Sequence, residues 1–233
     1  MIIDLHLVII ITILFVAKDQ VIIFGAGGHA KSIISIIQSK SELEIFGILI
    51  DSEFQKEQEK VLDHSVLGGR EMFSTLVKSG ISNAVVGIGD NKVRADISIE
   101  LQHHGFTMVS PTHQQSLLMS GVRIGLGTIV HAFAVVGTES LIGNNTIISA
   151  NAVIGHNCVI GNHCQITPGV LIGGGVNIGD YSFLGLGSVV LPGVNIGKNT
   201  IIGANAVVNK DLEDNAVLVG NPGKVIKYQD PIA

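Results

Sequence analysis

The chain has 233 residues, enough for two modest domains, and 46% of them are hydrophobic whereas only 14% are charged. This low charge fraction leaves few side chains to solvate a large monomeric surface, which favours self-association. The formal net charge of -5 and the lack of any block of Lys or Arg exclude a nucleic-acid-binding surface, whose affinity would come mainly from phosphate neutralisation.

The chain begins with an apolar extension, which we delimit to residues 1–18. Residues 5–17 are almost wholly apolar, but a transmembrane helix needs about 20 apolar residues. A secretory signal needs a basic start, and Asp4 is the only charged residue before Lys18. We therefore expect no membrane span. The extension is interpreted as a peripheral segment, or as a translated stretch upstream of the natural start.

Residues 19–110 alternate apolar runs with helical stretches. The pattern predicts strands over 21–24, 45–50 and 84–88, helices over 30–38, 70–79 and 92–104, and a last short segment over 106–109. Strands that alternate with helices are typical of a small, Rossmann-like parallel α/β sheet. Ser110 and Pro111 mark the passage into the next domain.

Two glycine-containing loops follow predicted strands of this domain. GAGGHAK at residues 25–31 satisfies G-x-G-x-x-A, and glycines there let a phosphate approach the backbone at a helix N-terminus. GIGDNK occupies residues 87–92, and loops at the carboxyl ends of parallel strands line one crevice. A single nucleotide-like ligand is expected rather than NAD, because the sheet is too short for a second mononucleotide half; a glycine turn used only for packing is the alternative. The residues grouped in this way are Gly27, Gly28, His29, Asp51, Gly89 and Asp90.

From Leu118 to Val208 an aliphatic residue recurs at every sixth position, sixteen times in all. A Gly follows most of them, as suits a tight corner, and a small or β-branched residue stands two places before each. This period matches neither the α-helical period of about 3.6 residues nor a heptad, and so many glycines would cost a helix roughly 1 kcal/mol each. Three hexads complete one three-sided coil, and stacked coils pair as parallel strands. We predict a left-handed parallel β-helix over residues 111–214, followed by a turn-rich tail over 215–233.

Cysteine and histidine positions inside this repeat bear on chemistry. Cys158 and Cys164 are six residues apart, so they belong to successive faces and are expected to be core thiols rather than a zinc pair or a disulfide. We assign no metal, and we expect a cytoplasmic protein. His131, His156 and His163 lie outside the inward series, so each should project where another subunit could meet it. His156 stands out because Asn157 follows it in the sequence GHNC.

Together, GAGGHAK, GIGDNK, the hexads with GHNC and the closing GNPGKVIK resemble the bacterial nucleotide-sugar acetyltransferases related to bacillosamine N-acetyltransferase and the sialic acid O-acetyltransferase-like proteins, over about residues 20–227. The resemblance implies a homotrimer that holds a nucleotide-linked amino sugar in the N-terminal domain and acetyl-CoA between neighbouring solenoids, with a shared active site. His156 then matches the general base, and the main-chain amide of Gly174 matches the oxyanion donor. The positions that match substrate-binding residues are Gly27, Gly28, His29, Asp51 and Gly89.

Two positions depart from the pattern of that family. Asn157 stands where an acidic residue usually orients the imidazole, and Gln165 stands where many relatives place a His near acetyl-CoA. Asn can orient a histidine but stabilises an imidazolium less. The resemblance implies N-acetylation of a nucleotide-linked 4-amino-6-deoxy sugar for surface glycans such as lipopolysaccharide. Two alternatives remain open: O-acetylation of sialic acid or a related sugar, and a non-catalytic trimeric scaffold that binds sugar nucleotides.

Overall fold

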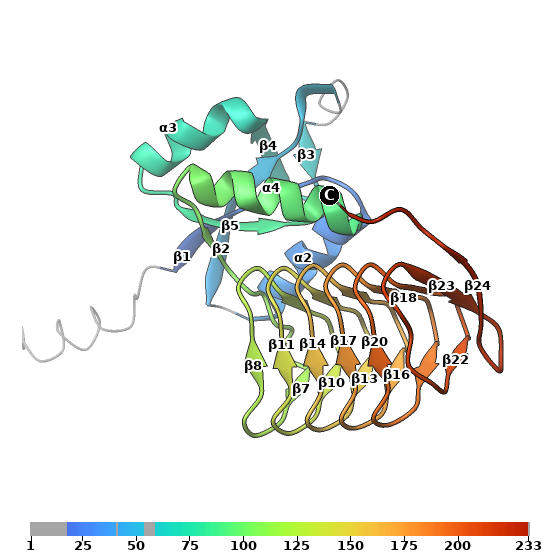
Figure 1. Cartoon of the computed structure of the whole chain (residues 1–233). Coiled ribbons are helices and arrows are strands. Elements are labelled where there is room, and N and C mark those ends of the chain that lie inside the picture. Colours follow the sequence, from blue (N-terminus) through green and yellow to red (C-terminus); the bar gives the residue numbers. More distant parts are fainter. Residues whose placement is uncertain (1–17, 41, 54–58, 233) are drawn as a thin grey trace, which may run out of the picture.

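The structure is a computed structural model that describes residues 18–40, 42–53 and 59–232. It consists of an α/β unit and a solenoid of short parallel strands (Figure 1). The predicted apolar extension lies outside the described residues except for Lys18. Among the described helices, none is long and apolar enough to cross a membrane.

A six-stranded sheet organises the α/β unit, in the order β3-β4-β2-β1-β5-β6. All neighbours pair in parallel except β3 and β4, which pair antiparallel at one edge. The predicted parallel sheet is confirmed, whereas β3 and β4 were missed because these short edge strands have little apolar alternation. The strands are β1 (Asp19–Phe24), β2 (Leu43–Leu49), β3 (Lys60–Val61), β4 (His64–Gly68), β5 (Asn83–Val86) and β6 (Thr107–Met108).

Helices cover both faces of this sheet. Ile33 and Ile34 of α2 pack with sheet residues and with Ile129 and Ile147 of the solenoid, so α2 lies between the sheet and the solenoid (Figure 1). The opposite face packs against α3 and α4 around the fully buried Phe73. The predicted helix over 70–79 is divided into a 3-10 turn and a short α-helix. The helical segments are α2 (Gly28–Ser39), η2 (Arg70–Met72), α3 (Phe73–Lys78) and α4 (Asn91–His103).

The solenoid contains sixteen two-residue strands, each ending at one of the predicted aliphatic positions. They form three parallel sheets, one for each face of the prism, in which strands eighteen residues apart pair, as Ile148 does with Ile166. The predicted parallel β-helix is confirmed. The strands are β7 (Leu117–Leu118), β8 (Arg123–Ile124), β9 (Ile129–Val130), β10 (Val135–Val136), β11 (Leu141–Ile142), β12 (Ile147–Ile148), β13 (Val153–Ile154), β14 (Val159–Ile160), β15 (Gln165–Ile166), β16 (Leu171–Ile172), β17 (Asn177–Ile178), β18 (Phe183–Leu184), β19 (Val189–Val190), β20 (Asn195–Ile196), β21 (Ile201–Ile202) and β22 (Val207–Val208).

The aliphatic positions form the core of the prism. From Val130 to Val208 each is at most 4% exposed, whereas Leu118 in the open first coil is 37% exposed. Cys158 and Cys164 are buried free thiols of the same core, as predicted. Burial of one such aliphatic side chain stabilises the fold by about 1.5–3 kcal/mol, so the repeated column, together with the backbone hydrogen bonds between coils, holds the coils together.

The recurring glycines are required for a reason other than the one we predicted. The left-handed corner conformation belongs to the residue two places later, for example Asn145 and Asn157, each with a φ of 55°. At Gly143 the backbone of the next coil is so close that an added Cβ would lie 2.6 Å from the carbonyl carbon of Gly161. Glycine at these positions therefore permits the close approach of stacked coils, rather than a tight corner.

The repeat continues beyond Val208 in a shifted register. Leu212 and Leu218 both join the solenoid core, which means that one hexad is two residues short and the next is complete. Leu212 bridges Ile196, and β23 (Ala216–Val219) pairs parallel with β21. The predicted turn-rich tail over 215–233 thus contains two strands that we missed, since β24 (Lys224–Tyr228) also folds back antiparallel on β23.

Replacement of Gly143 by Ala should destabilise the solenoid by about 3 kcal/mol, the range of overpacking in a tight interior. The reason is the contact of the new Cβ with the backbone of the next coil. Thermal unfolding of the full protein measures the effect. Gly193→Asn is the control, since Gly193 has a φ of 76° and open space around its Cβ position, and Asn tolerates this conformation. Equal unfolding temperatures for the two variants would contradict the packing argument.

Candidate active site

The first cavity of the site lies at the carboxyl ends of β1, β2 and β5 and has a volume of about 570 Å³. Gly27 and Gly28 at the start of α2 line it, and an added Cβ on either would meet nothing within 4 Å, so their backbone is open to a ligand. His29, Asp51 and Gly89 line the same cavity. The structure thus brings together all five residues that we predicted to bind the substrate.

Asp51 has a cationic partner that the sequence did not indicate. Its carboxylate accepts hydrogen bonds from Arg70 Nε at 2.6 Å and from Arg70 Nη2 at 3.1 Å. Arg70 also pairs with Glu100, and its guanidinium lies 5.8 Å from the ring centroid of Phe24. A ligand that uses Asp51 therefore meets an ion pair rather than an isolated carboxylate.

His29 and Gly89 are in close contact at the floor of this cavity. A Cβ added to Gly89 would lie 2.8 Å from His29 Nε2, so only glycine fits beside this imidazole. Burial lowers the pKa of His29, and the positive charge of Arg94 lowers it further. At pH 7 this side chain is therefore neutral and can donate or accept a hydrogen bond.

Arg94 of α4 connects the α/β unit to the solenoid, and sequence reasoning missed it. The side chain is fully buried, and its guanidinium donates to carbonyl oxygens of both parts. On the solenoid side the acceptors are Asn145 at 3.0 Å, His163 at 3.0 Å and Cys164 at 3.1 Å. In the α/β unit they include Gly89 at 2.8 Å. Burial lowers the pKa of Arg94 to about 10, so the group remains a cation at pH 7 and is satisfied by carbonyl dipoles.

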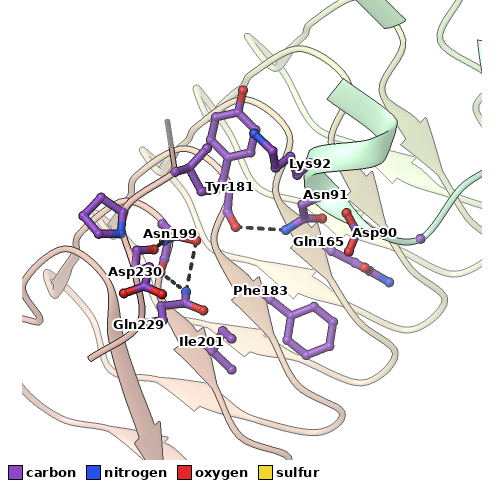
Figure 2. A pocket seen from close by; sticks show the side chains of 13 residues that line it. Asp90, Asn91, Lys92, Gln165, Tyr181, Phe183, Asn199, Ile201, Gln229 and Asp230 are labelled. Atoms are coloured by element: carbon purple, nitrogen blue, oxygen red, sulfur yellow. Dashed lines mark hydrogen bonds between the residues drawn. The ribbon is translucent and has the colours of Figure 1, made fainter. Parts of the chain in front are cut away.

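A second cavity of about 760 Å³ lies beside this junction (Figure 2). Its walls are residues 89–92, the solenoid residues Gln165, Phe183 and Ile201, and the tail at residues 229–232. Figure 2 shows Asn91 reaching the solenoid, where its Nδ2 donates to the carbonyl oxygen of Tyr181 at 2.9 Å. Gly89 lines both cavities, so the two lie on either side of the same loop.

His156 occupies an exposed corner between β13 and β14. Its Nδ1 is 2.9 Å from Oδ1 of Asn157, and Nδ2 of Asn157 donates to Oε2 of Glu139 at 3.0 Å. The opposite ring nitrogen lies against the next coil, since a Cβ added to Gly174 would be 2.5 Å from Nε2. In the described part of the chain, the Gly174 amide donates to no protein acceptor, whereas Gly175 N donates to the His156 carbonyl.

The remaining candidates lie at other corners of the prism. Gln165 of β15 lines the second cavity, one face away from His156 and Gly174, so one chain does not bring the three together. We predicted that His131 and His163 project where another subunit could meet them; within this chain both are half-buried and contact its own residues. His163 stacks on Tyr181 and its carbonyl binds Arg94, while His131 is half-buried with its pKa lowered to about 4 by burial and by nearby His29.

One missed residue could have been found from the sequence. Glu139 stands eighteen residues before Asn157, so the coil period places it directly below that side chain. No sequence period identifies Arg94, because it lies on a helix whose many charged and polar residues are typical of a solvent-exposed surface. Among the described residues, no group of His, Cys, Asp and Glu side chains is arranged to hold a metal ion.

Replacement of Arg94 by Met should destabilise the protein by about 3–5 kcal/mol, because several buried carbonyl oxygens lose their donor at once. Urea unfolding of the full chain measures this loss. Arg123→Met provides the control, since Arg123 is exposed on β8. Equal effects of the two substitutions would show that the buried network contributes nothing.

Acid should weaken the same junction. The pKa of His131 is about 4 in the folded protein against its ordinary value of 6.5, so the unfolded chain binds more protons between these values. The stabilisation from neutral His131 is complete above pH 6.5 and falls as pH decreases towards 4, by about 3 kcal/mol in total. Urea unfolding at several pH values should show a shallower slope for His131→Gln than for the wild type. Parallel slopes would contradict the assignment.

Comparison with known proteins agrees with this architecture. Residues 20–101 match the PglD N-terminal domain family, and residues 139–174 and 175–210 match the bacterial transferase hexapeptide (six repeats) family. A histidine-to-asparagine variant of perosamine N-acetyltransferase from Caulobacter crescentus, solved with CoA and GDP-perosamine, is 34% identical with a TM-score of 0.85, over 91% of this chain and 98% of that chain. No curated protein matches the chain.

Two further structures share the fold. The acetyltransferase domain of PglB from Neisseria gonorrhoeae, solved with acetyl coenzyme A, is 25% identical with a TM-score of 0.81, over 90% of this chain and 100% of that chain. WeeI from Acinetobacter baumannii is 22% identical with a TM-score of 0.79, over 88% and 99%. The similarity to the perosamine enzyme and the two family matches confirm the predicted resemblance: the chain belongs to the nucleotide-sugar acetyltransferases of the bacterial hexapeptide-repeat superfamily.

Proposed function

We propose that this protein transfers the acetyl group of acetyl-CoA to the amine of a nucleotide-linked 4-amino-6-deoxy sugar, for the synthesis of surface glycans. The solved relatives support this proposal, because the perosamine enzyme is described as an N-acetyltransferase in complex with CoA and GDP-perosamine. Acetyl-CoA is the co-substrate. The proposal assigns no metal.

The corner of His156 carries the proposal. It combines a ring nitrogen that faces Gly174 with a Gly174 amide that donates to no acceptor in the described part of the chain. A base and an oxyanion donor side by side are what acyl transfer to an amine requires. Two solved forms of the perosamine enzyme carry a replaced histidine, one by Asn and one by Ala, which agrees with an important histidine in the family.

Each residue of the corner then has a defined part in the reaction. The sugar amine attacks the thioester carbonyl carbon while His156 Nε2 takes the amine proton. The amide of Gly174 donates to the oxygen that becomes negative. The tetrahedral intermediate collapses with cleavage of the carbon–sulfur bond, and His156 gives the proton that it took from the amine to the leaving thiolate, which yields the free thiol of CoA and the neutral imidazole. The products are the N-acetylated sugar nucleotide and CoA.

The nucleotide portion of the acceptor fits the first cavity. Gly27 and Gly28 lie at the N-terminus of α2, where open backbone and the positive end of the helix dipole favour a diphosphate. Asp51 and His29 supply further polar groups to the lining of this cavity. From there the sugar passes Gly89 into the second cavity, towards Gln165.

The proposed protein is a homotrimer with shared active sites, and two features of the chain support this part of the proposal. The cavities lie at the α/β junction, whereas His156 lies one corner away on the same chain. Both faces beside His156 carry exposed aliphatic columns, Leu141 and Val159 on one face and Val153 and Leu171 on the other. Burial of these columns between neighbouring copies would bring one chain's His156 to another chain's sugar and leave a groove for acetyl-CoA. Cytoplasmic location remains a prediction.

His156→Ala should reduce acetyl transfer at least a hundredfold, the usual contribution of a positioned general base. Release of the CoA thiol is measured with acetyl-CoA and a panel of GDP-, UDP- and dTDP-linked 4-amino sugars, with hydroxyl-only sugars and sialic acid as comparison acceptors. His103→Ala is the control, since His103 is exposed at the end of α4. Full activity of His156→Ala, or transfer only to hydroxyl acceptors, would refute the proposed reaction.

A further inference from the structure

The corner of His156 contains a carboxylate from a different coil. Asn157 accepts from His156 Nδ1 at 2.9 Å through its Oδ1 and donates to Glu139 Oε2 at 3.0 Å through its Nδ2. The three side chains thus form one hydrogen-bonded series that crosses from one coil to the next. Its outer member is an anion, and its inner member is the imidazole whose other nitrogen faces Gly174.

The carboxylate determines which way the Asn157 amide is oriented. A carboxylate only accepts hydrogen bonds, so the amide must present its NH₂ group to Glu139. Its carbonyl oxygen then necessarily faces His156, where it can only accept. His156 must therefore carry its proton on Nδ1, which leaves the lone pair on Nε2, on the side of Gly174. The reverse amide orientation would place two acceptors against each other at Glu139.

We propose that Glu139 is a positioning residue for His156, acting across one coil through the amide of Asn157. The inference rests on the proposed acetyl transfer, in which His156 is the base. It adds a residue outside the predicted set, and it accounts for the neutral residue after the histidine: the negative charge is present, but one coil below. During the reaction this charge stabilises the imidazolium that forms on His156 as the amine proton moves to Nε2.

The geometry of the solenoid explains why this hydrogen-bonded relay from Glu139 through Asn157 to His156 spans two coils. Glu139 and Asn157 occupy equivalent corner positions eighteen residues apart, both left-handed, with φ values of 58° and 55°. Equivalent positions on stacked coils lie one above the other, so their side chains run side by side. Asn and Asp tolerate this backbone conformation better than other non-glycine residues, which makes Asp a suitable probe at position 157.

The proposal is tested in the acetyl-transfer assay by variants that exchange the carboxylate of Glu139 and the amide of Asn157. Glu139→Gln keeps an acceptor oxygen for Asn157 but removes the charge that stabilises the imidazolium formed in the reaction, and should lower kcat roughly tenfold with little change in KM. The double variant Glu139→Gln with Asn157→Asp restores a carboxylate beside the imidazole and should recover most of kcat.

Glu213→Gln serves as the matched control, since Glu213 is an exposed carboxylate near the far end of the solenoid and its removal should change neither kcat nor KM. The proposal is overturned if Glu139→Gln behaves like this control. It is also overturned if the double variant stays as slow as Glu139→Gln, since a purely structural role of Glu139 would not be replaced by Asp at position 157.

A second measurement does not depend on activity. Nitrogen-15 NMR of histidine-labelled full-length protein should show His156 with its proton on Nδ1 at a pH where the ring is neutral. Glu139→Lys presents a donor instead of an acceptor, reverses the Asn157 amide and should move the proton to Nε2. An unchanged tautomer would refute the relay. If no acceptor is acetylated by the wild-type protein, the proposed function fails, and the tautomer still decides the role of Glu139.

Discussion

The stacking of equivalent residues every eighteen positions is the constraint on which the solenoid and its chemistry depend. It places each aliphatic side chain on the one below and brings neighbouring backbones so close that Gly143 and its equivalents cannot carry a Cβ. The same constraint fixes each corner, where a left-handed residue turns the chain. A functional group at one corner is therefore held against what the adjacent coils present. His156 lies between Gly174 of the next coil and Asn157, whose amide binds Glu139 of the preceding coil.

The junction between the two parts of the chain is held by a different interaction. A fully buried cation is costly unless its hydrogen bonds are satisfied, and Arg94 meets this demand with main-chain carbonyl groups from both sides. Since one of these carbonyls belongs to Gly89, the network also fixes the loop shared by the two cavities. The lowered pKa values of His29 and His163 follow from burial beside this cation. The position of the Gly89 loop and the docking of the α/β unit on the solenoid thus have one physical cause.

The sequence predicted what is periodic or follows a simple topological rule. The aliphatic hexads predicted the β-helix, and the crevice rule brought Gly27, Asp51 and Gly89 to one cavity. Prediction from the sequence failed for interactions between elements that are far apart in the chain and share no sequence pattern. Arg94 looks like any charged helical residue until the solenoid carbonyls surround it, and the orientation of His131 depends on how the α/β unit docks. The continuation of the solenoid after Val208 was missed for another reason. A search at a fixed spacing of six residues does not find Leu212 and Leu218, because the hexad before them is two residues short.

That shortening has a consequence for how the molecule ends. A solenoid that stopped on a complete coil would offer a full set of unpaired parallel strands to the next molecule, which is the geometry of a growing fibre. Here the last coil is two residues shorter than the others. At its edge β24 pairs antiparallel with β23, and this exposed strand carries Lys224 and Lys227. The terminal edge no longer matches the repeat of another copy. The two-residue shortening after Val208 therefore disfavours end-to-end polymerisation, and copies can associate only through the lateral faces of the prism.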